Sequence, residues 1–122
     1  MNARGLAVGF LVLGLASSAC GAERICGACH SFPGFAEPAG AMQGPTLIGL
    51  LGRKVGSVRD FDYSDAMLEA GRAGLVWDEA MLRRYVEDPQ AVVPGTFMAA
   101  PIFRDAAERE RVLRQVLARR AP

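Results

Sequence analysis

The sequence has little net charge, a formal +1, since 14 lysines and arginines stand against 13 aspartates and glutamates in 122 residues. Without a basic excess there is no electrostatic basis for a nucleic-acid partner, and without an acidic block there is no solvating tail. With 51% hydrophobic and 22% charged residues, the composition suits one globular domain. Charge alone identifies no partner.

β-strand patterns and a second histidine are also missing. Apolar and polar residues do not alternate over more than a few positions, so the sequence predicts no strand and an all-α fold. His30 is the single histidine, so any site that needs two imidazoles is excluded.

The N-terminal segment has the three-part pattern of a secretory signal peptide. A basic residue precedes the apolar run at 6–16, and small residues follow it. A bilayer span needs roughly 20 apolar residues, so cleavage is favoured over the alternative of a retained anchor. Cleavage after Ala19 or after Ala22 satisfies the small-x-small rule. We therefore divide the chain into a signal peptide at 1–22 and a domain at 23–122.

The segment Cys26-Gly27-Ala28-Cys29-His30 has the spacing of a c-type haem attachment site. Thiols three residues apart share one face of a helical turn, so both sulfurs can reach the vinyl groups on one porphyrin edge. The next side chain, His30, then projects toward the iron. One short segment predicts three bonds to one cofactor.

Two other interpretations use the same residues. A thioredoxin-like dithiol belongs at a strand-to-helix turn of a βαβ unit, and no strand pattern flanks Cys26. A zinc site would join Cys20 to Cys26, Cys29 and His30. Adjacent Cys29 and His30 reach one tetrahedral ion with difficulty, and Cys20 lies at or before the expected cleavage point. Haem attachment is the favoured interpretation.

Short helices separated by long loops are predicted for the rest of the chain. Glycine and proline recur through residues 31–52, which predicts a wrapping loop. Ser64 caps a helix that runs to about Ala70, and Gly71 stops it.

Two further helices carry apolar stripes. Asp78 caps a helix that Pro89 ends, and Asp105 with Glu108 resembles a capping box that opens a last helix. The stripes recur at one-face spacing: Met81, Leu82, Tyr85 and Val86, then Val112, Leu113, Val116 and Leu117.

Residues 89–105 show no regular pattern but are apolar, so this long loop is expected to be functional and to cover something large. Within it Met98 follows a stiff Pro94-Gly95 turn. Met67 and Met81 are on helices and are explained by core packing, and Met42 lies in the glycine-rich loop that follows His30. Met98 therefore stands apart from the other candidate thioether ligands.

Several segments occur in the order found in one family: residues 26–30, 44–47, 49–54, 61–66, Trp77, 85–89 and 94–98. Together they resemble a class I cytochrome c of the mitochondrial and bacterial soluble type, from Cys26 to about Leu117. The resemblance implies an all-α cytochrome c fold with short helices and long loops around one covalent haem c. It also implies that Met98 is the second iron ligand, opposite His30.

The resemblance implies supporting roles for other residues. The carbonyl of Pro45 would accept a hydrogen bond from the His30 ring and fix its tautomer. Arg53, Tyr63 and Trp77 resemble the family's donors to the haem propionates.

On the methionine side of the haem, the resemblance assigns two hydroxyl groups to the lining. They belong to Tyr85 and Thr96.

The implied function is that of a single-electron carrier in a periplasmic or respiratory chain, working with redox partner proteins and not as an enzyme. Iron bound by His30 and Met98 has no open position for a substrate, and the soft thioether raises the reduction potential. The alternatives are a haem subunit of a dehydrogenase complex and a peroxidase-like enzyme with Met98 displaced. Membrane association is expected only if the N-terminal segment is retained.

Two departures from the family pattern have consequences. Ser18 and Ala22 stand where an N-terminal helix would carry its glycine and aromatic residue. The usual partner of Val112 and Val116 is therefore expected to be missing, replaced by a partner protein, or built from a retained signal segment. The lysine cluster that many relatives show around the haem edge is also absent. A strongly acidic partner surface is therefore not expected.

We predict that the exported protein begins at Cys20 or Glu23 and is recovered in the soluble periplasmic fraction. Mass spectrometry of the purified protein measures the start directly. Full-length chain recovered with the membrane would show instead that the segment is an anchor.

Overall fold

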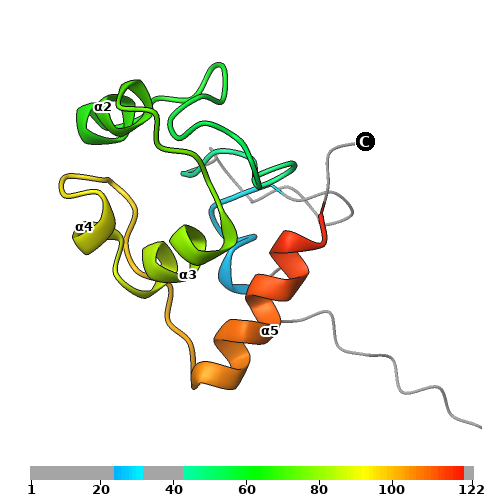
Figure 1. The fold of residues 1–122 in the computed structure, drawn as a ribbon. Coiled ribbons are helices and arrows are strands. Elements are labelled where there is room, and N and C mark those ends of the chain that lie inside the picture. The colour runs from blue at the N-terminus through cyan, green and yellow to red at the C-terminus, as the bar shows by residue number, and fades with distance from the viewer. Residues whose placement is uncertain (1–23, 32–42, 120–122) are drawn as a thin grey trace, which may run out of the picture.

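The computed structural model describes residues 24–31 and 43–119, so the predicted signal peptide, Cys20 and Met42 lie outside the described residues. Within them no strand occurs, only one antiparallel bridge between Lys54 and Val76. None of the helices in these ranges is long and apolar enough to cross a bilayer. The labelled helices are α2 (Asp65–Arg72), α3 (Glu79–Glu87), α4 (Pro89–Val92) and α5 (Ala106–Leu117) (Figure 1).

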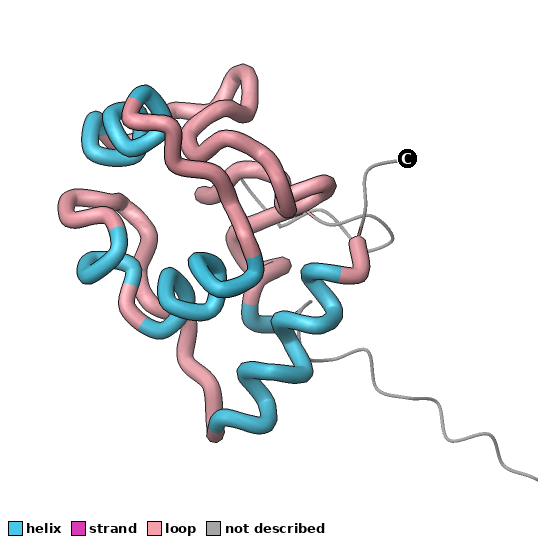
Figure 2. The backbone as a smooth tube through the Cα atoms, in the orientation of Figure 1, coloured by secondary structure: helices cyan, strands magenta, loops and turns pink. Residues whose placement is uncertain are grey.

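Long loops precede α2, at 43–64, and α5, at 93–105, whereas only Asp88 separates α3 from α4 (Figure 2). A turn of helix at 24–25 leads into a series of turns through His30 and lies beside α5. The fold prediction is confirmed.

Helix α2 begins as predicted but ends later. The Ser64 hydroxyl accepts a hydrogen bond from the Met67 backbone N–H at 3.2 Å, so the predicted cap is confirmed. The predicted stop at Gly71 is wrong, because the helix continues to Arg72. A side chain at Gly71 would collide with the Val55 carbonyl, so this glycine permits a close approach of helix and loop.

The boundary between α3 and α4 also differs from the prediction. Helix α3 ends at Glu87, and Asp88 then caps a further turn by accepting from the Ala91 backbone N–H at 3.1 Å. Pro89 occupies the first position of α4, where its missing N–H has no partner to lose. The expectation that residues 89–105 are irregular is therefore wrong for the first four.

The apolar face of α5 is buried. Asp105 accepts from the Glu108 backbone N–H at 2.8 Å, which confirms the predicted start of the helix. Val112 and Val116 are 0% and 3% exposed, and Ile25 packs against the same core. The face that bears these two valines points inward, toward the core and the cavity described next. The N-terminal helix that would be their usual partner falls on residues before 24, outside the described residues, so that expectation stays a prediction.

Candidate haem site

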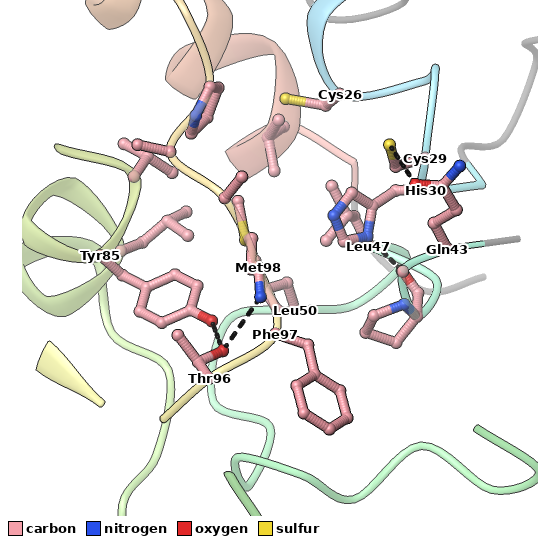
Figure 3. A pocket seen from close by; sticks show the side chains of 18 of the residues that line it. Cys26, Cys29, His30, Gln43, Leu47, Leu50, Tyr85, Thr96, Phe97 and Met98 are labelled. Carbon is pink, nitrogen blue, oxygen red and sulfur yellow. Dashed lines mark hydrogen bonds between the residues drawn. The ribbon is translucent and has the colours of Figure 1, made fainter. Parts of the chain in front are cut away.

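A cavity of about 420 Å³ lies between the turn at 25–30, the loop at 43–53, the segment at 96–103, α3 and α5. Its size falls in the range of about 300–1,000 Å³ that is usual for ligand sites. Every residue assigned to the site from the sequence lines this one space. They are Cys26, Cys29, His30, Pro45, Arg53, Tyr63, Trp77, Tyr85, Thr96 and Met98. Figure 3 labels six of them, Cys26, Cys29, His30, Tyr85, Thr96 and Met98.

The two cysteines are free thiols on one helical turn. The backbone N–H groups of Cys29 and His30 donate to the Cys26 carbonyl at 3.1 and 2.9 Å, so residues 26–30 form the helical turn that the haem-attachment motif predicts. Burial raises the pKa of the Cys26 thiol to about 11, and Cys29 adds to the shift. A thioredoxin-like dithiol needs a lowered thiol pKa. The observed environment therefore disfavours that alternative.

The His30 ring is held from one side by its neighbours in the loop. Its Nδ1 donates to the Pro45 carbonyl at 2.7 Å, which leaves Nε2 for a metal ion. Burial lowers the pKa of His30, against the opposing effect of the Pro45 bond, so the imidazole is neutral at neutral pH. Only a neutral imidazole has the lone pair that iron needs.

Gly44 has a positioning role that the sequence analysis did not assign. A Cβ at this position would collide with the His30 ring, so only glycine lets the loop pass so close to the imidazole. The signal was present in the sequence as a Gly-Pro pair, but only the fold places it against His30.

Met98 enters the cavity from a segment held by several hydrogen bonds. Thr96 Oγ1 lies 2.7 Å from the Tyr85 hydroxyl and accepts from the Met98 backbone N–H at 3.4 Å. Gln90, a residue that the sequence analysis missed, donates to the Thr96 carbonyl at 2.8 Å and accepts from the Gly95 N–H at 3.0 Å. The turn before Met98 is therefore fixed from α3 and α4.

The Arg53 guanidinium holds the loop that follows Pro45. It donates to the carbonyls of Thr46 at 2.7 Å and Ile48 at 2.9 Å. Burial lowers the pKa of Arg53, although the group stays charged. Within the described ranges no carboxylate forms an ion pair with it.

Tyr63 and Trp77 complete this wall of the cavity. The Tyr63 hydroxyl accepts from the Val58 backbone N–H at 3.3 Å, and its own proton is left to donate. Trp77 is buried and meets the Tyr85 ring edge-on at 4.9 Å.

Met67 has a second role beyond the one predicted. It is buried in the core as expected, but its side chain also lines the cavity. Met81 is buried without reaching this space. The described residues thus bring two thioethers, those of Met67 and Met98, to the cavity wall.

Comparison with known proteins identifies the family. No family profile matches the chain. Cytochrome c2 of Rhodoblastus acidophilus is 40% identical over 88 residues, which cover 71% of this chain and 76% of that protein. Class I cytochrome c is the family to which this chain belongs. Cytochrome c-550 of Bradyrhizobium diazoefficiens is 46% identical over 74 residues, covering 61% of this chain and half the length of that relative.

Solved structures of cytochromes of this family superpose on the chain. The chain superposes on cytochrome c2 of Rhodospirillum centenum with a TM-score of 0.68 at 27% identity, covering 83% of this chain and 93% of that one. The superposition on cytochrome cH of Methylobacterium extorquens has a TM-score of 0.60 at 33% identity and covers 80% of this chain and 91% of that one.

Membership in the class I cytochromes c confirms the predicted family and the predicted cofactor class, one covalent haem c with its iron. These cytochromes are electron carriers rather than enzymes, and they work with redox partner proteins. The cavity fits such a group, because free thiols, a neutral imidazole and thioethers meet in one mostly apolar space. The roles of the individual residues remain predictions.

The hydrogen bond between Tyr85 and Thr96, which lies beside Met98, can be tested by its contribution to stability. Thr96→Val leaves the buried Tyr85 hydroxyl unpaired, so we expect the free energy of unfolding of the haem-loaded protein to fall by about 1–3 kcal/mol. Adding Tyr85→Phe removes both partners, and the double variant should lose less than the sum of the single losses. Denaturant titrations measure all three values, and strictly additive losses would contradict the coupling.

Proposed function

We propose that this cytochrome carries single electrons between redox proteins, with its haem attached through Cys26 and Cys29 and its iron bound by His30 and Met98. The observation that supports this most directly is the convergence of these four side chains on one cavity of about 420 Å³. When bound, the haem supplies an iron that takes up and releases one electron.

The surroundings of the two proposed ligands favour a carrier over a catalyst. The Pro45 carbonyl orients His30, and the bonds through Thr96 and Gln90 orient the turn before Met98. Two ligands supplied and held by the chain leave no open coordination position for oxygen or substrate. A peroxidase-like enzyme needs such an opening.

We assign the propionate side of the haem to Arg53, Tyr63 and Trp77. A half-buried guanidinium without a carboxylate partner among the described residues is costly, and a propionate would neutralise it. The Tyr63 hydroxyl retains a proton that it can donate to the same group.

The signal-peptide pattern at 1–22 supports export, so we place the mature protein in the periplasm. The donor and the acceptor are redox proteins of that compartment.

Covalent attachment predicts that haem stays with the polypeptide in acidified organic solvent and gives a c-type pyridine haemochrome. The protein must be produced in cells competent for cytochrome c maturation. Extractable haem would refute thioether attachment. The double variant Cys26→Ala with Cys29→Ala is the control, and it should contain no covalently bound haem.

Met98 as ligand predicts a weak charge-transfer band near ~695 nm in the oxidised protein, the approximate position for iron–thioether bonding. Met98→Ala should abolish the band, lower the reduction potential by about 0.1–0.3 V as the soft ligand is lost, and open the iron to carbon monoxide.

Met67→Leu is the matched control, because Met67 brings the other described thioether to the cavity. This variant should keep the band and exclude carbon monoxide, and Met42→Ala should behave in the same way. Loss of the band in Met67→Leu alone would transfer the ligand role to Met67. Ready carbon monoxide binding by the unmutated protein at neutral pH would refute the carrier proposal.

A further inference from the structure

Glu108 is the one buried carboxylate in the described part of the chain, with 2% of its side chain exposed. Its Oε2 accepts from the Arg104 backbone N–H at 2.7 Å, and its Oε1 accepts from Arg104 Nε at 3.0 Å. The guanidinium of Arg24 donates to the same Oε1 at 3.3 Å, and that of Arg111 lies 3.8 Å away. Three cations therefore converge on one carboxylate, which none of the roles assigned above uses.

The contacts of Glu108 exceed what a helix cap needs. In a capping box the third helical residue reaches back to the N–H of the cap residue, here Asp105. Glu108 reaches one residue further, to Arg104, and so holds the chain that enters α5. The Arg104 backbone N–H, and then its guanidinium, keep the pKa of the Glu108 carboxyl below its usual range. The group is thus a charged anchor at neutral pH.

The chain held in this way is the segment that carries Met98. Upstream, the Met98 backbone N–H is bonded to Thr96. Downstream, residues 99–103 make no hydrogen bond within the described ranges, and Ile102 is 90% exposed. The next hydrogen-bonded point after Met98 is therefore Arg104, at the Glu108 carboxylate, directly after Phe103, which packs against the core.

The same carboxylate also reaches the opposite side of the cavity. Arg24 lies two residues before Cys26, on the turn of helix beside α5. Glu108 thus links the segment bearing Met98 with the segment bearing Cys26 and His30, although Arg24 and Glu108 are 84 positions apart in the sequence.

We propose that Glu108 is a positioning residue for the iron site, which limits the movement of the Met98 thioether by fastening the end of its segment to α5 and to the turn before Cys26. The inference rests on the proposed ligand role of Met98. Neutralising Glu108 loosens Met98, whereas His30 keeps its separate support from Pro45.

The test compares Glu108→Gln with Glu110→Gln in the haem-loaded protein. Glu110 is on the same helix and pairs with Arg83 at 3.2 Å in a half-exposed position, so it controls for the loss of one helix charge. We expect Glu108→Gln to weaken the methionine charge-transfer band and to raise carbon monoxide affinity by about tenfold or more, the worth of one charge-assisted hydrogen bond. Amide hydrogen exchange at 99–104 should accelerate in parallel. Glu110→Gln should change none of these.

Arg104→Gln is the second variant, since it leaves the buried carboxylate and the backbone bond in place. It should shift the same readouts in the same direction by less, and Arg104→Lys should recover part of the change. If Glu108→Gln fails to fold, Arg104→Gln decides. Lower stability with unchanged band, affinity and exchange would overturn the proposal, because Glu108 would then act on the fold alone. Absence of the band in the unmutated protein would refute the Met98 assignment itself, and this inference with it.

Discussion

The structure depends on one constraint, which is that its helices surround a cavity instead of closing on one another. The apolar faces of α3 and α5 line this space through Leu82, Val86, Leu113 and Val116. A domain of about a hundred residues has little core to spare. The fold already removes these side chains from water, since they are 2–7% exposed, and a large flat group bound in the cavity would add packing contacts to them.

The helices supply walls, but the loops supply the chemistry. His30 and Met98 both lie outside the labelled helices, where backbone groups have no regular partners. Side chains provide those partners: Arg53 for the loop after Pro45, Gln90 for the turn before Met98, and Glu108 for the chain after it. Each of these bonds joins a side chain to a backbone group, so it holds an irregular loop in place without regular secondary structure.

Errors in the predicted helix boundaries have two different physical causes. Gly71 and Pro89 are both common at helix ends, and the sequence analysis assigned them there. Gly71 lies inside α2 because the Val55 carbonyl passes close to it, and Pro89 begins α4 because Asp88 caps a new turn. The competing influence was a tertiary contact in the first case and an overlooked cap in the second.

Local spacing predicted the haem motif at 26–30, and it was sufficient for the caps Ser64, Asp78 and Asp105 and for the all-α class, because each depends on residues within a few positions of one another. The fold alone decided that Gly44 packs on the His30 ring, that Met67 reaches the cavity, and that Arg24 meets Glu108. These contacts join segments that lie far apart in sequence or pass through loops without periodicity. No local pattern encodes them, since they exist only once the chain has closed around the site.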